Sequence, residues 1–302
     1  MHTLAGSYAD EIKSNNHSHS EGHTIMNSSQ AQAGSVVSLW RYPVKSMMGE
    51  ELNAAVVTQS GIIGDRAYAF IDLSTGKVAS AKNPQKWAKL FNFRAAFVEP
   101  PRQGAHLPAV RVTLPDGNIV TTEEPDLNRI LSNVLGREVT LGTTPPATPS
   151  LEEYWPDIDG LAHRETTTDE SIHSGTFFDG AVIHLLTTAT IDRLRDLYPQ
   201  GRFEVRRFRP NIVVESSTGE KGFLENGWVG RTLAIGTDVR LNIVRGCERC
   251  VMTTLPQGDL PKDSGILRTA AQHNQVNVGV YASVLQGGTI IRGDAVRLEE
   301  SP

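Results

Sequence analysis

Short β-type segments, separated by Gly, Pro and Asp, make up most of the chain from residue 36 onward, and this pattern restricts the fold more than any other feature. Runs rich in β-branched and aromatic residues between such turn residues are typical of strands. In the first half we expect strands at Val36–Tyr42, Ala54–Thr58, Ala67–Asp72, Ala109–Leu114 and Ile119–Thr121. In the second half we expect them at 203–215, 232–236, 239–245, 250–254 and 276–285, followed by two paired strands over 289–298 around Gly293-Asp294.

Three helices interrupt these strands. Asn83-Pro84 resembles an N-cap followed by proline at the first helical position, and it opens a helix over 84–91. A second helix, over 125–136, has apolar residues at helical spacing and Gly136 at its end. A third, over 187–201, ends at Pro199 and Gly201. The sequence therefore predicts a β-rich α+β fold with a few helices.

Two segments lack a sustained period. Residues 1–34 are polar, with neither the basic start and apolar stretch of a secretory signal nor the arginine content of a mitochondrial presequence, so we expect a disordered tail. Residues 143–175 are rich in Pro, Thr and acids, and we expect a linker or a long functional loop.

Composition excludes several classes of protein. Two cysteines cannot form a disulfide scaffold, which favours a reducing compartment, and no apolar run is long enough to span a bilayer. A net charge of −5 argues against a general nucleic-acid binder. We therefore expect a cytoplasmic protein that contacts neither membrane nor nucleic acid. Walker, dinucleotide-binding, HExxH and GxSxG motifs are all absent.

The segment GCERCVMTTL (246–255) carries the most specific chemistry. A Cys-x-x-Cys pair is compatible with redox chemistry, half of a zinc site, a single thiolate ligand, or two small buried residues on a strand. The β-branched residues after Cys250 favour a strand over the helix of a thioredoxin-type site. Arg249 beside Cys250 favours a thiolate, because an adjacent positive charge stabilises it.

Two further groups of residues suit an anion. Residues 201–250 contain nine Lys or Arg against six Asp or Glu. On a strand, Arg207 and Arg209 would point the same way and could clamp a planar anion, although a solvated arginine face is the alternative. Lys45, Ser46 and Arg66 offer a phosphate site if their two segments meet in space.

Four ordered motifs, WRYPVKS, GDRAYAF, RRFRPNIVV and GCERCVMTTL, together resemble those of MOSC proteins, the group named after the molybdenum cofactor sulfurase C-terminal domain. The arrangement is most similar to the mitochondrial amidoxime reducing component and its bacterial relatives. The resemblance implies a smaller N-terminal MOSC β-barrel domain at 35–142, then the 143–175 segment, and a MOSC β-barrel domain at 176–300.

The resemblance also implies roles for individual residues. Cys250 matches the catalytic thiolate that ligates molybdenum in the molybdenum cofactor (Mo-molybdopterin). Lys45, Ser46 and Arg66 match positions that hold the pterin's terminal phosphate. Other matched positions contact the cofactor, namely Arg209 and Asn211 in FRPN and Thr187 at the end of VIHLLT. On this resemblance, the separate groups of residues become parts of one anionic-cofactor site.

The implied activity is reduction of N-hydroxylated small molecules by removal of the N–O oxygen at molybdenum. No cysteine follows Cys250, so the chain cannot hold a four-cysteine iron–sulfur cluster, and we expect a separate reductase or small redox protein as electron donor. The stretch 255–265 departs from the family's Asp-Pro-x-Thr-Gly pattern near the metal motif, which leaves substrate preference open. The alternative is a molybdenum cofactor or sulfur carrier that lacks reductase activity.

Overall fold

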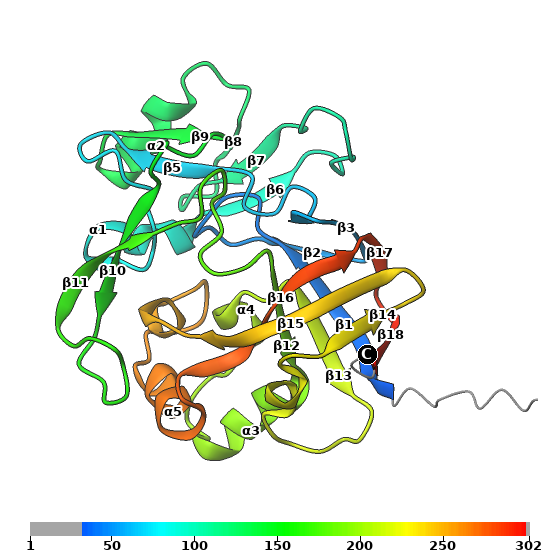
Figure 1. The fold of residues 1–302 in the computed structure, drawn as a ribbon. Helices are drawn as coiled ribbons and strands as arrows, with labels where there is room; N and C mark the ends of the chain where they lie inside the picture. Colours follow the sequence, from blue (N-terminus) through cyan, green and yellow to red (C-terminus); the bar gives the residue numbers. More distant parts are fainter. Residues whose placement is uncertain (1–31, 300–302) are drawn as a thin grey trace, which may run out of the picture.

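A closed barrel of seven strands forms the centre of the computed structural model, which describes residues 32–299 (Figure 1). Around the ring the strands are β13 (Ile212–Ser216), β12 (Ile183–Thr187), β16 (Asn277–Gln286), β15 (Val239–Glu248), β14 (Thr232–Ile235), β18 (Ala295–Glu299) and β1 (Gln32–Arg41). Pairing between β1 and β13 closes the ring, and β2 (Glu50–Leu52) adds to β1. The predicted β-rich fold with a barrel is confirmed.

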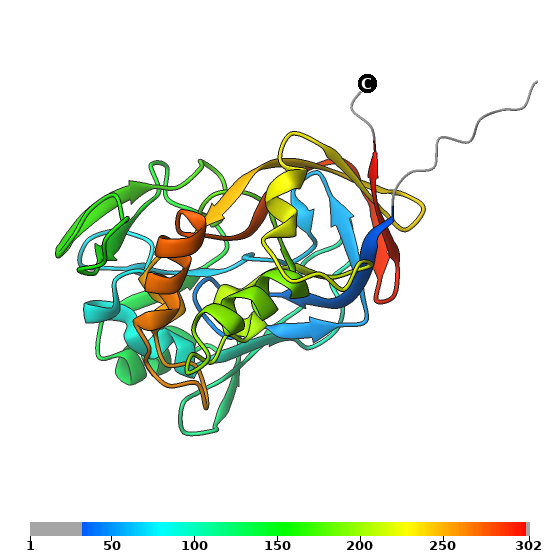
Figure 2. The ribbon, with the colours of Figure 1, turned by 90° about the horizontal axis from the view of Figure 1, so that it is seen from below.

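Apolar side chains fill the barrel because alternate residues of each strand face inward. Leu39, Leu185, Val214, Ile243 and Val280 are all at most 1% exposed and belong to one cluster. The parallel pair β12–β13 needs a crossover, which α3 (Thr188–Leu197) and α4 (Val205–Phe208) supply. Together with α5 (Gly265–Asn274), these helices cover the barrel wall through a second apolar cluster (Figure 2).

Several small sheets surround a third apolar cluster outside the barrel. Its elements are β5 (Ala69–Asp72) paired with β9 (Val139–Gly142), the three-stranded sheet β6 (Arg94–Phe97), β7 (Val110–Thr113) and β8 (Ile119–Thr121), and the helices α1 (Pro84–Trp87), η1 (Ala88–Asn92) and α2 (Leu127–Leu135). A further sheet joins β3 (Ala54–Thr58) and β4 (Gly61–Ile62) to β17 (Gly288–Ile291), and η2 (Leu224–Trp228) precedes β14.

Several elements that the local sequence predicts are confirmed. Strands β3 and β8 have the predicted bounds. Helix α2 ends at Gly136, whose φ of 70° is the left-handed conformation expected at a helix end. The helix predicted over 84–91 is a turn of α-helix followed by a 3₁₀ helix, α1 and η1.

The segment 143–175 is not an irregular linker. It contains the antiparallel hairpin β10 (Ser150–Trp155) and β11 (Thr166–Ser171), which stands beside the barrel at the left of Figure 1. Most of its β11 residues are exposed, so the hairpin lacks the inward-facing apolar pattern that would have identified it.

Three other predictions about strands are wrong. Residues 203–215 and 250–254 were expected to be continuous strands, but the first contains the helix α4 and the second is mostly the 3₁₀ helix η3 (Val251–Thr254). The strands within 289–298 exist, yet β17 pairs with β3 while β18 pairs with β14 and β1. Strand pairing and tertiary packing decide these cases, and local propensity is the weaker influence.

The predicted tail falls mainly on residues 1–31, which lie outside the described residues. Its last part is ordered, because β1 begins at Gln32, paired with Arg297 of β18, and Gly34 pairs with Ser216 of β13. The residue limits of the two domains stay a prediction, although the barrel takes β1 from the N-terminal segment.

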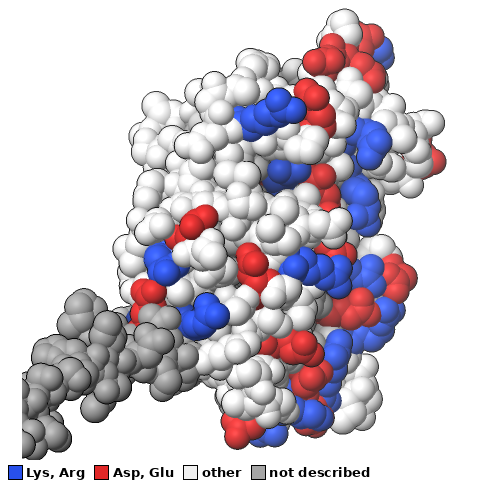
Figure 3. Space-filling model, turned by 90° about the vertical axis from the view of Figure 1, so that its right-hand side faces the viewer, with Lys and Arg blue, Asp and Glu red and all other residues white. Residues whose placement is uncertain are grey.

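No helix within residues 32–299 is both long and apolar enough to cross a membrane. Figure 3 shows one face of the molecule, on which Lys and Arg lie next to Asp and Glu without a broad area of one sign. The concentrated charge of this protein is instead found inside a pocket.

Candidate functional site

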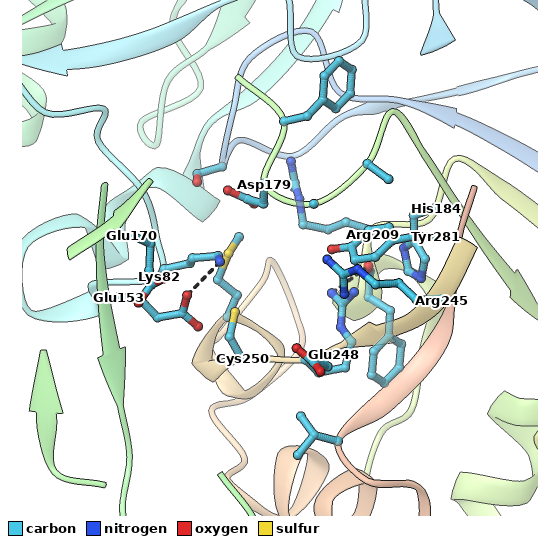
Figure 4. A pocket seen from close by; sticks show the side chains of 18 of the residues that line it. Lys82, Glu153, Glu170, Asp179, His184, Arg209, Arg245, Glu248, Cys250 and Tyr281 are labelled. Carbon is cyan, nitrogen blue, oxygen red and sulfur yellow. Dashed lines mark hydrogen bonds and ion pairs between the residues drawn. The ribbon is translucent and has the colours of Figure 1, made fainter. Parts of the chain in front are cut away.

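One pocket of about 580 Å³ gathers nearly all the residues that the sequence singled out (Figure 4). The loop after β1, the segment between α4 and β13, the end of β15 and the β10–β11 hairpin all contribute to its walls. Six predicted site residues line it, namely Lys45, Ser46, Arg66, Arg209, Asn211 and Cys250. Their individual roles in cofactor binding stay predictions, but the expectation that distant segments meet is fulfilled in the structure.

Arg209 reaches the pocket because the chain reverses at the end of α4. Its backbone is left-handed, with φ of 55°, and its Nη1 donates to the carbonyl of Met47 at 2.5 Å. The guanidinium lies 4.2 Å from the ring centroid of Tyr42, a cation–π contact. Burial, together with the nearby Arg66 charge, lowers the pKa of Arg209 to about 10. The protein therefore keeps a cation in a place where it is poorly solvated.

Arg207 does not point with Arg209, which corrects the prediction of a paired arginine clamp. It lies within α4 and is fully buried. Its guanidinium donates to four backbone carbonyls, those of Arg202 (2.8 Å), Thr253 (3.2 Å), Leu255 (3.2 Å) and Pro261 (2.8 Å). Arg207 therefore fastens the turn after Cys250 to α4 and is not free to bind a ligand.

Lys45 and Ser46, from the loop after β1, line one wall of the pocket. The Lys45 ammonium donates to the Phe177 carbonyl at 2.8 Å and to the Asp179 carboxylate at 2.6 Å. Burial lowers the pKa of Lys45. The Ser46 hydroxyl accepts from the backbone N–H of Ala81 at 3.1 Å. This wall thus presents a desolvated ammonium whose ion-pair partner comes from a distant loop.

Arg66 and Asn211 share the buried carboxylate of Asp65. That carboxylate accepts from the backbone N–H of Tyr42 at 2.7 Å and from Asn211 Nδ2 at 2.9 Å, and it pairs with the Arg66 guanidinium. Asn211 also accepts from the His184 N–H at 3.1 Å. These bonds join the loop after β1, the start of β12 and the start of β13, so they fix the floor of the pocket.

Cys250 is half-buried and comes directly before η3. The hydroxyls of Thr253 and Thr254 donate to the carbonyls of Cys250 and Val251, three residues back in each case, and so stabilise the tight 3₁₀ turn that replaces the predicted strand. Burial and the Glu153 charge raise the pKa of Cys250 to about 11. In the protein alone this thiol is protonated near neutral pH.

The Arg249 charge acts mainly on the other cysteine, contrary to the sequence-based interpretation. Arg249 Nη1 lies 2.6 Å from Cys247 Sγ, and its Nη2 donates to the Phe208 carbonyl. Although burial opposes it, the charges of Arg249 and His184 lower the pKa of Cys247 to about 6. Cys247 is fully buried, so it packs and orients Arg249 without facing the pocket.

Among the residues to which the family resemblance gave a role, Thr187 is the one that does not line the pocket. It is fully buried at the N-terminus of α3, where its hydroxyl accepts from the Thr190 N–H at 3.1 Å and donates to Glu225 at 2.6 Å. The family resemblance implied a cofactor contact for Thr187, whereas in the structure its hydroxyl caps the helix that follows. Its observed contacts are structural.

Backbone strain concentrates at the pocket. Six non-glycine residues of the described chain have positive φ, and five of them line it: Ser46, Arg66, Arg209, Gln275 and Val276. Such conformations cost about 1–3 kcal/mol each and persist where surrounding structure enforces them. This clustering supports the assignment of the pocket as the functional site.

The pocket fits an anionic cofactor that brings its own metal. Within residues 32–299, no group of three or more His, Cys, Asp or Glu side chains is placed to hold a metal ion. A metal at Cys250 would therefore need most of its ligands from a cofactor. Arg249 Nε–H is buried with no hydrogen-bond partner in the described part of the chain, so it can still donate to an acceptor.

Sequence reasoning missed several pocket residues. Lys82 pairs with Glu153 at 2.8 Å beside Cys250 (Figure 4). Asp179, Arg245 and Tyr281 also line the pocket. Lys82 directly precedes the Asn-Pro helix signal, and Glu153 belongs to the segment interpreted as a linker. Trp155, from the same segment that was expected to be a linker or a long functional loop, also lines the pocket.

Comparison with known families defines the class of protein. Residues 169–297 match the MOSC domain, and residues 33–100 match the MOSC N-terminal beta barrel domain. The chain is therefore a MOSC-domain protein that also carries the N-terminal beta barrel domain, which confirms the resemblance of the four motifs.

Among curated proteins, the chain is similar to mitochondrial amidoxime reducing component 2 of rat and of cattle. It is 24% identical to the rat protein over 246 residues, which covers 78% of this chain and 69% of the rat protein. It is 24% identical to the bovine protein over 236 residues, covering 74% and 67%, respectively. This is distant homology.

Solved structures give weaker likenesses. The YuaD protein of Bacillus subtilis is 10% identical with a TM-score of 0.44, covering 89% of this chain and 97% of that one. YiiM of Geobacillus stearothermophilus is 18% identical with a TM-score of 0.30, covering 45% and 67%, respectively.

Proposed function

We propose that this MOSC protein is a molybdenum-cofactor oxidoreductase that reduces N-hydroxylated small molecules at a molybdenum ligated by Cys250. The observation that carries the proposal is the meeting, in one pocket, of a single half-buried thiol with the buried cations Lys45 and Arg209 and the partly buried Arg66. A soft thiolate suits a metal already held by the sulfurs of a pterin dithiolene. The cations suit the phosphate and the negative charge of such a cofactor.

Each pocket residue has a defined task in this proposal. Lys45 and Arg66 bind the phosphate, while Arg209 neutralises charge in a site from which water is largely excluded. Asn211 fixes the position of the pocket floor through its hydrogen bonds with Asp65 and His184. Cys250 gives up its proton when it becomes a ligand, because metal binding requires the thiolate.

The bound cofactor would supply two-electron chemistry in which an N-hydroxylated compound, two electrons and two protons yield the reduced nitrogen compound and water. The relatives support this reaction class through their name, amidoxime reducing component. The electrons come, in our proposal, from a separate reductase or small redox protein.

Elemental analysis tests the proposal most directly. The wild-type chain, Cys250→Ala and the matched control Cys247→Ala would be expressed in a host that makes molybdenum cofactor. We expect near-stoichiometric molybdenum in wild type and in Cys247→Ala, and none in Cys250→Ala. Reduction of an amidoxime and of a hydroxylamine by a chemically supplied electron donor should follow the same order.

Full molybdenum occupancy and turnover in Cys250→Ala would refute Cys250 as the ligand. Molybdenum in wild type without turnover of any N-hydroxylated substrate would leave a cofactor-binding protein and refute the reductase. No molybdenum in either protein would favour the sulfur-carrier alternative, for which persulfide trapping on Cys250 is the assay.

A further inference from the structure

An acidic side chain of the protein itself occupies the place expected for an anion. Lys45 is 4% exposed, and its ammonium group is covered on the pocket side by Asp179, whose carboxylate is 2.6 Å away. The second bond of this ammonium goes to the Phe177 carbonyl at 2.8 Å, in the same short segment. Two of the three N–H donors of Lys45 thus bond to residues 177–179.

Asp179 is surrounded by cations yet is not enclosed. Burial opposes its ionisation, but the charges of Lys45, Lys82 and Arg66 hold the pKa of this carboxyl far below its usual range. Its side chain is nevertheless 34% exposed, whereas the Lys45 side chain is 4% exposed. The Asp179 carboxylate, labelled in Figure 4, is therefore more open to the pocket than the ammonium with which it pairs.

The segment that carries Asp179 is irregular and borders two hollows. Residues 172–182 form neither helix nor strand. Phe177 and Phe178 line both the main pocket and a second hollow of about 660 Å³, which also shares Arg66. Gly175 has a φ of 76° and no neighbouring atom within 4 Å of where a Cβ would lie, so the chain is open at this point. Phe177 is 2% exposed in an apolar cluster with Leu151, so it would have to leave that cluster if the whole segment moved.

We propose that Asp179 is an internal substitute for the phosphate group of the cofactor, and that residues 174–180 move away from Lys45 when that phosphate binds. The inference rests on the proposed function for the identity of the anion. It adds Lys82 to the cations that face the phosphate, and it gives the 174–180 segment a role in admitting the cofactor.

Electrostatics makes the two occupants mutually exclusive. A phosphate bound to Lys45 while Asp179 remained in place would put two anions within a few ångströms of each other in a poorly solvated site, which is strongly unfavourable. An empty site without Asp179 would leave a buried ammonium unpaired, which is also costly. Asp179 thus stabilises the protein without cofactor and lowers its apparent affinity for the incoming anion.

The test uses protein prepared without cofactor, with inorganic phosphate as the probe. Calorimetric titration would compare wild type with Asp179→Asn and Asp179→Ser, and with the control Asp169→Asn, which removes a carboxylate paired with Lys77 outside the pocket. Loss of the competing charge should tighten phosphate binding by about tenfold or more in both Asp179 variants. The control should bind as wild type does.

Hydrogen–deuterium exchange supplies the second measurement. Saturating phosphate should increase exchange over 174–180 in wild type, and the Asp179 variants should show raised exchange there without phosphate. Phosphate affinity that is unchanged or weaker in the Asp179 variants would overturn the proposal, and so would a lack of phosphate binding in all variants. Because no step measures reduction, a protein that lacks reductase activity can still pass this test.

Discussion

Replacement of Arg207 by Met tests whether a buried arginine outside the pocket holds the site together. The four carbonyls that accept from Arg207 belong to three separate segments, around residues 202, 253–255 and 261. Methionine fills similar volume but donates no hydrogen bond. The change therefore leaves these carbonyls without their partner while the surrounding packing is largely kept.

The magnitude follows from how deeply the bonds are buried. The contacts to Thr253 and Leu255 are fully buried, whereas those to Arg202 and Pro261 are partly buried. An unsatisfied buried carbonyl costs about 1–3 kcal/mol, and water can reach the two partly buried ones. Removing the guanidinium also removes the cost of burying its charge. We expect a net loss of about 3 kcal/mol in the free energy of unfolding.

Urea unfolding followed by tryptophan fluorescence measures this loss. Arg206→Met is the matched control, because Arg206 is its neighbour in α4 but pairs at the surface with Glu204 and Asp259. We expect at most a small shift of its midpoint. Arg207→Lys should also be destabilised, because an ammonium lacks the planar fork that reaches four acceptors. A free energy of unfolding for Arg207→Met within about 1 kcal/mol of wild type would refute the reasoning.

Three further predictions concern other buried groups. Burial raises the pKa of Glu225, so the contribution of this carboxyl to stability is present at low pH and is lost as pH rises. In thermal melts, Glu225→Gln should therefore gain stability relative to wild type between about pH 4 and about pH 7, and a difference in melting temperature that stays constant with pH would contradict this. Gly279→Ala should unfold at a lower urea concentration than Gly117→Ala. Both glycines have positive φ, but only a Cβ at position 279 would meet another atom, His184 Nε2 at 2.4 Å. Equal unfolding midpoints of the two variants would exclude that clash. In thiol labelling followed by mass spectrometry, Cys250 should react before Cys247 despite its higher pKa, because Cys247 is fully buried; the reverse order would show that the pKa dominates.

The sequence was most informative where an element carries its own start and stop. Pro125 and Gly136 bracket α2, and alternating exposure along β3 reflects one face on the barrel side and one outside. Burial also alternates along β10 of the hairpin, but its buried residues are Leu151 and the acidic Glu153, and β11 contains no apolar residue, so the sequence shows no alternation of apolar and polar residues there. Residues in a segment of this kind acquire their role only through tertiary contacts.

The candidate site was predictable as a set of residues but not as a set of contacts. Motif resemblance selected Lys45, Arg209 and Cys250, and all three line the pocket. A strand-based prediction nevertheless paired Arg209 with Arg207, because periodicity cannot show that α4 forms there and that Arg209 adopts a left-handed backbone. Likewise, no local pattern indicates that Asp179 lies against Lys45, which is 134 residues away in the chain.

Long-range contacts of this kind explain how a pocket formed by loops can be rigid enough for chemistry. Arg209 is bonded to Met47 across 162 residues, and Asn211 to Asp65 across 146 residues. The first bond connects the segment just before β13 directly to the loop after β1. The second connects it to Asp65 in the loop after β4, and Asp65 in turn accepts from the Tyr42 N–H in the loop after β1. Strands β1 and β13 are themselves paired in the barrel. The register of one strand pair therefore sets the distance between the two cationic walls of the pocket. Because a one-residue slip of β1 would turn its inward side chains outward, the apolar filling of the barrel fixes that register. The hydrophobic core thus determines where the charged groups of the site stand.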